Sequence, residues 1–271
     1  MTQPDLRGLG VLLTRPLVQA QRTAAALRDT GARVFILPAL EITPVDSSPQ
    51  LDAVLARARD ADWVVFISAN AVEHGLPQIA RTGGTGGQTR IAAIGAATRA
   101  ALVAGGYAEV VMPLAGNDSE ALLAHPDLQH VTGQHIIIVR GQSEGGGRRL
   151  LGETLSRRGA TVHFAECYLR AKPQPDPASL ESLLASWKIG EVDAVQVMSV
   201  ETLENLVSLI AERGLALLCN TCLLAPHRRI AQAAHALGCS DTRVCGLDDA
   251  QLIACLAAIK AHKQDIPRNR A

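Results

Sequence analysis

The chain has 271 residues, which at ~150 residues per domain is enough for about two domains with ample core. It is 48% apolar but only 3% aromatic, and this favours an α/β protein whose sheets are packed with aliphatic side chains. The 26 basic residues balance the 26 acidic ones, which argues against binding to nucleic acid or to a membrane surface, so an anionic ligand must be held by local groups.

The N-terminal segment GLGVLLTRPLVQAQRTAAALRDTGARVFILPALEITP predicts a strand, a turn, a helix and a second strand. The first strand ends at Arg15, the helix runs through Leu27, and the second strand covers residues 33–37. Prolines bracket residues 38–44 and keep this stretch extended. A helix is then expected at residues 51–58, where apolar side chains recur on one face.

The middle of the chain repeats this pattern and places small or polar residues at the ends of strands. Strands are expected at residues 63–67, 91–94, 110–112, 136–139 and 161–165. Ser68 and Asn70 follow the first of these, and both are residue types that cap helix starts. The strand at 136–139 ends in Arg140. Gly141 and the glycine cluster at 145–147 then free the backbone to turn and to expose N–H groups before the next helix.

The chain leaves this region through residues 167–173, CYLRAKP, an extended and proline-stopped segment like that at 38–44. Because both segments join the same two parts of the chain, we expect them to run side by side. Further strands are expected at residues 193–198, 221–225 and 242–245. The last helix, at 247–259, precedes a basic tail that we expect to be disordered.

The two sets of elements match one another and predict two domains of one design. Arg15 aligns with Arg140, and the strand before Ser199 aligns with the strand before Ser68. The middle lobe is therefore predicted to be a circular permutation of the outer lobe. We expect an α/β protein with two flavodoxin-like parallel-sheet lobes, the second inserted in the first, and with ligand groups at the carboxyl ends of the strands. The expected boundaries are residues 1–39 and 172–271 for the outer lobe, 45–166 for the inserted lobe, and 40–44 and 167–171 for two linker strands.

The six cysteines are scattered, which argues against a disulfide framework. Cys219 and Cys222 have the spacing of a redox or zinc pair, but a redox pair belongs at a helix start and a zinc site needs a second ligand pair. Cys239, Cys245 and His227 lack regular spacing, so we interpret the cysteines as small packing residues. Neither a signal peptide nor a membrane span is indicated, and we expect a cytoplasmic protein.

The order of the segments resembles the uroporphyrinogen-III synthase family. The resemblance covers nearly the whole chain and is carried by VLLTRP, FISANAVEHGL, IAAIGAATRAALVAGG, IIIVRG with its glycine turn, LLGETLSRRGATV and ECYLRAKP. It implies a cyclising lyase that converts hydroxymethylbilane to uroporphyrinogen III, with loss of water and inversion of ring D through a spiro intermediate, in haem biosynthesis. It also implies no metal, no organic cofactor, a monomer, and hand-over of the substrate from the preceding bilane-forming enzyme.

Such a reaction requires mainly orientation from the protein. The bilane loses its hydroxyl with help from its own pyrrole nitrogen, and the resulting electrophile closes without inversion when it is left alone. The enzyme must exclude that geometry and present another, which explains why the sequence shows no catalytic triad, carboxylate pair or metal cluster. The substrate's carboxylates can be received by N–H groups at helix starts and by hydroxyls.

The resemblance assigns the catalytic role to Tyr168, whose phenol would hydrogen-bond or protonate the departing hydroxyl. A residue packed on the connector is the alternative. The substrate-binding residues that the resemblance implies are Ser68, Asn70, Gly95, Thr98, Arg140 and Gly141 in the inserted lobe, and Arg15, Ser199 and His227 in the outer lobe. Plain helix caps, and surface charges at strand ends, are the alternatives for the polar residues of this set.

The outer lobe departs from the family's pattern at residues 198–201 and 225–229. These departures motivate a second hypothesis, a non-catalytic two-lobed module that binds a tetrapyrrole or a small anion. A third, a nucleotide-sugar transferase with two Rossmann-like lobes, is disfavoured by the short chain and by the missing nucleotide fingerprint.

Overall fold

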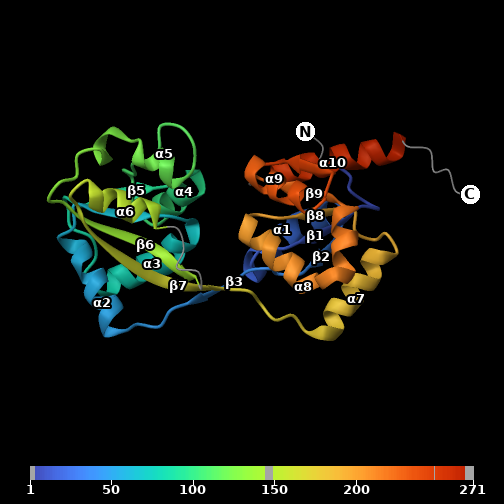
Figure 1. The fold of residues 1–271 in the computed structure, drawn as a ribbon, viewed down its shortest axis with the longest axis horizontal. Coiled ribbons are helices and arrows are strands. Elements are labelled where there is room, and N and C mark those ends of the chain that lie inside the picture. Colours follow the sequence, from blue (N-terminus) through green and yellow to red (C-terminus); the bar gives the residue numbers. More distant parts are fainter. Residues whose placement is uncertain (1–3, 144–148, 247, 266–271) are drawn as a thin grey trace, which may run out of the picture. The chain divides into compact units, whose positions relative to one another are not determined.

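The computed structural model describes residues 4–143, 149–246 and 248–265. The chain divides into two compact units, Met1–Glu41 with Lys172–Ala271, called here the outer unit, and Ile42–Ala171, called the inserted unit (Figure 1). Three predictions fall outside the described residues: the turn at the glycine cluster 145–147, the first residue of the last helix, 247, and the disorder of residues 266–271. In the described part of the chain, no helix combines the length and the apolar character needed to span a bilayer.

The outer unit is a five-stranded parallel sheet in the order β10-β9-β8-β1-β2. Its strands are β1 (Gly10–Leu13), β2 (Arg33–Ile36), β8 (Ala194–Gln196), β9 (Cys222–Ala225) and β10 (Thr242–Val244). Its helices are α1 (Leu17–Asp29), α7 (Pro177–Lys188), α8 (Val200–Cys219), α9 (Arg228–Ala236) and α10 (Asp249–Asp265).

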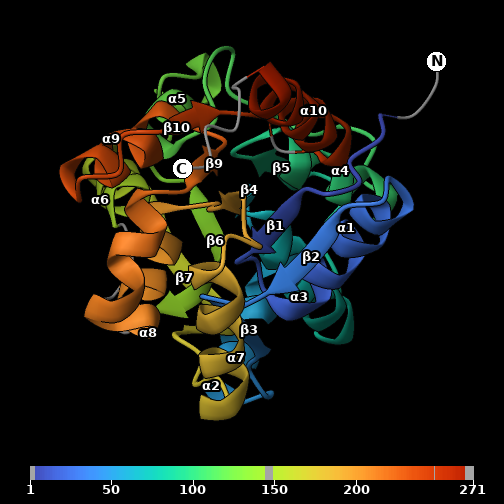
Figure 2. The same cartoon turned by 90° about the vertical axis from the view of Figure 1, so that its right-hand side faces the viewer.

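Helices cover both faces of the outer sheet (Figure 2). On one face Leu12 packs into a core cluster with side chains of α7, α8 and α9. On the other face Val11 and Leu13 pack with α1 and α10. Successive residues of β1 thus point to opposite layers, which is why this strand is apolar at every position instead of alternating.

The inserted unit holds a second sheet, in the order β3-β7-β6-β4-β5. Its strands are β3 (Glu41–Pro44), β4 (Trp63–Phe66), β5 (Arg90–Ala93), β6 (His135–Ser143) and β7 (Thr161–Ala171). Its helices are α2 (Pro49–Ala56), α3 (Ala69–Arg81), α4 (Ala96–Ala104), α5 (Ser119–Leu123) and α6 (Leu150–Arg157), with short 3-10 turns η1 (Arg57–Arg59) and η2 (Pro126–Leu128).

The central strand β6 is buried on both faces over residues 136–139, as a continuous β-branched run predicts for a parallel sheet. Ile137 and Val139 pack into one core cluster, and Ile136 and Ile138 into the other. Strand β6 pairs in parallel with β4 and β7, and β4 pairs in parallel with β5. At one edge of the sheet β3 is the neighbour of β7, and the N–H of Val45 donates to the carbonyl oxygen of Cys167 at 3.1 Å.

Strand β6 continues to Ser143, so Gly141 lies within the strand and not in the turn predicted after Arg140. Four further elements differ from the sequence prediction. The strand expected at 110–112 is reduced to a single bridge between Ala92 and Val111. Helix α7 was not predicted at all. The apolar spacing after Ser199 predicts a helix only through Ile210, but α8 extends to Cys219 across a break at Ala211, whose φ of 51° and ψ of −164° leave the helical path. Helix α10 extends to Asp265, so the prediction of disorder is wrong for residues 260–265.

Candidate functional site

In the inserted unit, the predicted site residues gather at the carboxyl ends of three neighbouring strands. Strands β6, β4 and β5 lie side by side in the sheet. Arg140 and Gly141 belong to β6, Ser68 follows β4, and Gly95 follows β5. Because parallel strands end at the same edge, the fold places these residues along one edge, where open α/β sheets bind their ligands.

Tyr168 and Ser68 form a hydroxyl pair at this edge. Ser68 begins α3 as its N-cap, and its Oγ accepts the N–H of Ala71 at 3.0 Å. The same Oγ lies 2.9 Å from the phenol oxygen of Tyr168, and either oxygen can be the donor. The Tyr168 side chain is only 1% exposed, whereas Ser68 is half-buried. Of the two hydroxyls, Ser68 is therefore the one nearer to solvent.

A β-bulge turns Tyr168 onto α3. The register of β6 and β7 shifts after Arg140, which opposes Glu166, so that Gly141 opposes Tyr168 and Cys167 is the extra residue. Cys167 and Tyr168, although adjacent in sequence, consequently pack in the same core cluster. A Cβ at Gly141 would lie 2.3 Å from the Tyr168 ring, so only glycine fits beneath the ring.

The Arg140 charge is held within the protein. Its side chain is 5% exposed, its Nε lies 3.3 Å from a Glu166 carboxylate oxygen, and its guanidinium carbon lies 5.1 Å from the centroid of the Phe164 ring. This environment excludes the alternative of an ordinary surface charge at a strand end for Arg140.

The remaining predicted residues of the inserted unit have unequal access. Asn70 is half-buried in the first turn of α3. Gly95 is the N-cap of α4 in an extended conformation, with φ −157° and ψ 172°. Thr98 is only 5% exposed, so its hydroxyl offers almost no surface to a ligand in this structure.

In the outer unit, Arg15, Ser199 and His227 likewise follow the neighbouring strands β1, β8 and β9. Arg15 Nε donates to Gln196 Oε1 at 3.0 Å, and Gln196 is 2% exposed at the end of β8. Burial lowers the pKa of the Arg15 guanidinium, and the carboxylate of Asp249 opposes this shift. The hydrogen bond to Gln196 and the charge of Asp249 thus hold the Arg15 guanidinium against the protein.

The helix starts of the outer unit differ from one another. Ser199 is the N-cap of α8, and its Oγ accepts the N–H of Thr202 at 3.0 Å. His227 is the N-cap of α9 but makes no capping hydrogen bond, and it is exposed together with Arg228 and Arg229. Cations at a helix start oppose the helix dipole, so this position gains stability when an anion is present.

Sequence reasoning missed two residues that organise the site. His74, on α3, has its ring centroid 5.5 Å from that of Tyr168, and nothing in its sequence position indicates this contact. Gln196 holds Arg15, and here a signal existed, because it is a polar residue in an otherwise apolar strand.

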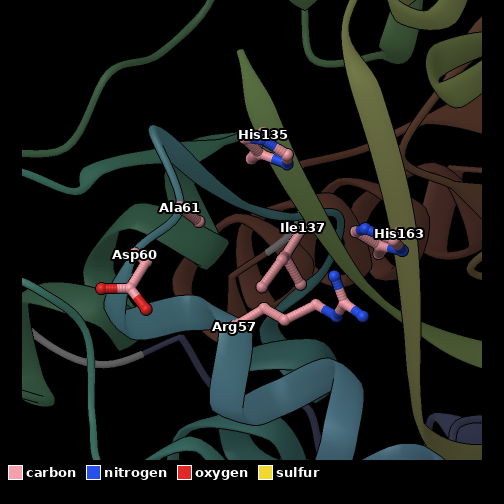
Figure 3. A pocket seen from close by; sticks show the side chains of 6 residues that line it. All are labelled: Arg57, Asp60, Ala61, His135, Ile137 and His163. Carbon is pink, nitrogen blue, oxygen red and sulfur yellow. The ribbon is translucent and has the colours of Figure 1, made fainter.

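The inserted unit also has a cavity of about 200 Å³ at the amino ends of its strands, opposite the edge that holds Ser68. It is lined by Arg57, Asp60, Ala61, His135, Ile137 and His163 (Figure 3). The Arg57 side chain extends toward His163, whose Nε2 is buried and has no hydrogen-bond partner among the described residues. Burial, and then the charges of Arg57 and His135, lower the pKa of His163. Since ligands of such sheets bind at the carboxyl ends, we do not assign the substrate to this cavity.

Among the described residues, no group of three or more histidine, cysteine, aspartate and glutamate side chains is arranged to hold a metal ion.

Comparisons with known proteins agree with one another. A family model described as uroporphyrinogen-III synthase HemD matches residues 21–245. Uroporphyrinogen-III synthase of Escherichia coli (strain K12) is 33% identical over 262 residues, which cover 93% of this chain and 100% of that protein. The uroporphyrinogen-III synthase of Synechococcus elongatus is 32% identical over 214 residues, 78% of each chain.

Two solved structures share the fold. A mutant uroporphyrinogen III synthase from the extremely thermophilic bacterium Thermus thermophilus aligns with a TM-score of 0.65 at 20% identity, over 95% of this chain and 100% of that one. The uroporphyrinogen-III synthetase from Helicobacter pylori 26695 aligns with a TM-score of 0.56 at 12% identity, over 92% and 99%.

Proposed function

This chain belongs to the uroporphyrinogen-III synthase family, and we propose that it cyclises hydroxymethylbilane to uroporphyrinogen III with loss of water and inversion of ring D. It is accordingly a cyclising lyase of tetrapyrrole biosynthesis. The match over the whole length of the Escherichia coli enzyme is the observation that carries this proposal.

The proposed architecture is two flavodoxin-like lobes, the second a permuted copy of the first and joined to it by two linker strands. Numbered by chain order, the outer sheet read from β2 to β10 has the order 2-1-3-4-5, which is the flavodoxin order. The inserted sheet gives the same order when the count starts at β6, with the bridge at Val111 in the place of the fifth strand. The pairing of β3 with β7 supports the linker strands, proposed at residues 40–44 and 167–171. The outer lobe is proposed to cover residues 1–39 and 172–271, and the inserted lobe residues 45–166.

The proposed chemistry begins with loss of the hydroxyl group from the bilane's hydroxymethyl carbon. The carbon–oxygen bond breaks as the adjacent pyrrole nitrogen supplies electrons, and the oxygen leaves as water after taking up a proton. The terminal ring then attacks the electrophilic carbon through its substituted position to give the spiro intermediate, which fragments and recloses with that ring inverted. The protein has to hold the ring in this geometry, since the free electrophile closes without inversion.

The Ser68–Tyr168 pair is the proposed source of help for the leaving hydroxyl. A serine oxygen accepts two hydrogen bonds and donates one. If Ser68 Oγ accepts from Ala71 N–H and from the Tyr168 phenol, its own proton is available to the substrate. Tyr168, expected from the sequence to act directly, is thus proposed to act through Ser68, because the phenol is buried.

The substrate's carboxylates are proposed to bind at the carboxyl edges of the two sheets. In the inserted unit the candidates are the starts of α3 and α4 with Ser68, Asn70 and Gly95, together with Arg140 and Gly141 in β6. In the outer unit they are Arg15, Ser199 and His227, where the exposed Arg228 and Arg229 add positive charge to a helix start. Thr98, a residue of α4, is proposed to serve only in packing, because it is buried.

The test of the activity adds the purified chain to freshly generated hydroxymethylbilane, followed by oxidation and separation of the porphyrin isomers. We expect isomer III. Formation of isomer I alone would contradict the proposal, and binding of the bilane without cyclisation would favour the non-catalytic binding module.

The chain is further proposed to act as a monomer that receives its substrate from the enzyme that forms the bilane. Light scattering on the purified protein should give a mass near 28.6 kDa. A mass of twice that value at assay concentration would contradict this assignment.

A further inference from the structure

Two cysteines of the outer unit meet across 20 residues of chain. Cys219 ends α8, and Cys239 lies between α9 and β10. Their sulfur atoms are 2.7 Å apart, which is closer than the ~3.5 Å of ordinary non-bonded heavy atoms. The sequence spacing suggests a pair of Cys219 and Cys222, but the fold brings Cys219 to Cys239 instead.

The two thiols differ in their access to solvent. Cys239 is fully buried in the core cluster that includes Leu218 and Ala234. Cys219 is partly exposed, and its Sγ lies 3.4 Å from the carbonyl oxygen of Leu237. Burial raises the pKa of Cys239 to about 12, so this side chain stays a protonated thiol at neutral pH. Cys219 is therefore the thiol that a dissolved oxidant reaches first, and the buried Cys239 sulfur lies in contact with it.

The helix that carries Cys219 is divided. Ala211 has a positive φ of 51° and interrupts α8, so the short helical segment that ends at Cys219 is joined to the first part of α8 by a non-helical residue. Small adjustments of this segment do not require a shift of Ser199 at the opposite end of the helix.

We propose that Cys219 and Cys239 are an oxidisable dithiol that a peroxide converts into an intramolecular disulfide. The Cys219 sulfur attacks one peroxide oxygen, so that a sulfur–oxygen bond forms, the oxygen–oxygen bond breaks, and the second oxygen leaves as water. This gives a sulfenic acid at Cys219. The Cys239 sulfur then attacks the Cys219 sulfur, the sulfur–oxygen bond breaks, and the hydroxyl leaves as water with the Cys239 proton. Two thiols are oxidised by two electrons in total, and one peroxide is reduced to two waters.

Peptide mapping tests this directly. The reduced full-length chain is treated with hydrogen peroxide, the remaining thiols are alkylated, and the protein is digested with trypsin without reduction. Cleavage places Cys219 together with Cys222 in residues 214–228, and Cys239 alone in residues 230–243. We expect a cross-linked species of these two peptides, lighter than their sum by two hydrogen atoms, that dithiothreitol separates. Oxidation should also raise the melting temperature by several degrees.

Two variants resolve which cysteine of the first peptide is involved. Cys219→Ser should abolish both the cross-link and the change in melting temperature. Cys222→Ala is the matched control, since Cys222 lies in the same peptide but is buried in β9, and it should keep both. A cross-link that persists in Cys219→Ser would overturn the proposal. So would oxidation of Cys219 to sulfinic acid without any cross-link to residues 230–243.

Discussion

At the scale of single residues, Tyr168 has two kinds of contact: it packs over Gly141, and its hydroxyl meets that of Ser68. The phenol is buried, yet its oxygen lies 2.9 Å from the hydroxyl of Ser68, which caps α3. The glycine leaves the space that the ring occupies. Removing the phenol oxygen of Tyr168 therefore tests its hydrogen bond to Ser68, whereas adding a methyl group at Gly141 tests the packing of the Tyr168 ring.

Replacing Tyr168 by Phe removes one hydroxyl and keeps the ring. We expect turnover to fall while KM changes little, because Ser68 loses the partner that orients its proton, and stability to fall by about 0.5–1.5 kcal/mol for one lost hydrogen bond. The control is Tyr107→Phe, which removes the phenol bonded to Thr85 at 3.2 Å and touches no proposed site residue. Equal turnover of Tyr168→Phe and the native chain would remove Tyr168 from the mechanism.

Replacing Gly141 by Ala should destabilise the inserted unit by about 1–3 kcal/mol, because the new methyl group overlaps the Tyr168 ring. Urea unfolding measures this change. Gly87→Ala is the matched control, since a Cβ there meets nothing within 4 Å, and it should leave the unit as stable or slightly more stable. A Gly141→Ala protein as stable as the native chain would show that the ring moves aside freely.

The sequence predicted where β4 and β5 end, but not how deeply the residues at the strand ends lie. Ser68 follows from the apolar run before it, because the end of that run marks the end of β4. Gly141 was predicted to follow its strand but lies within β6. The burial of Thr98, Arg140 and Tyr168 depends on a bulge and on helices from elsewhere in the chain. The contact between His74 and Tyr168 likewise depends on tertiary packing, and no local sequence pattern indicates it.

At the scale of elements, helix starts serve two purposes that substitution can separate. Ser199 caps α8 by accepting the N–H of Thr202, and this bond alone would explain a serine there. The proposed binding role also requires that a substrate carboxylate approaches Ser199.

Replacing Ser199 by Asp should separate these roles. Aspartate caps as well as serine, so the free energy of unfolding should change by less than about 0.5 kcal/mol. Its negative charge repels a carboxylate, so KM should rise clearly while kcat changes less. Ser48→Asp, at the cap of α2, is the control with unchanged KM. An unchanged KM for Ser199→Asp would reduce Ser199 to a cap.

The cavity at the amino ends of β6 and β7 should make stability depend on pH. Because the folded state lowers the pKa of His163 from 6.5, the unfolded chain binds this proton more readily, and the contribution of His163 becomes destabilising as the pH falls below about 6.5. We expect the loss of stability between about pH 7.5 and pH 5.5 to be smaller in His163→Gln than in the native chain. His130→Gln, at an exposed position of the same unit, should keep the native loss. Identical losses in the native chain and in His163→Gln would contradict this prediction.

Strands were predicted better than helix limits. A β-branched or aliphatic run is a local signal, and it located β4, β6 and β9 within a residue or two at their starts. The run at 110–112 is equally apolar, but it is left with one bridge partner. Helix α7 was missed even though Asp176 before Pro177 is a start signal. The break falls at Ala211 and not at Gly214, the glycine of this helix, so its position has no local signal.

At the scale of the whole molecule, the core clusters stay within the two units. Two clusters belong to the outer unit and two to the inserted unit. The two tryptophans are divided in the same way. Trp63 is buried in the inserted unit and bonds Gln134, and Trp187 is buried in the outer unit and bonds Thr221.

This division supplies a separate fluorescent reporter for each unit. In Trp187→Phe and Trp63→Phe, we expect the single remaining indole to report urea transitions with different midpoints. Adding Gly141→Ala should lower the midpoint reported by Trp63 and leave that reported by Trp187 unchanged. Coincident midpoints that move together would instead mean that the two units unfold as one cooperative body.

The order of strands in the outer sheet also has a consequence for synthesis on the ribosome. Strand β1 pairs with β8, and the N–H of Gly10 donates to the carboxylate of Asp193, which lies 183 residues later in the chain. The inserted unit, by contrast, is complete once residue 171 has been made. Translation therefore delivers every strand of the inserted sheet while β1 and β2 still lack β8, β9 and β10. The N-terminal strands emerge first, yet their sheet is the last to be finished.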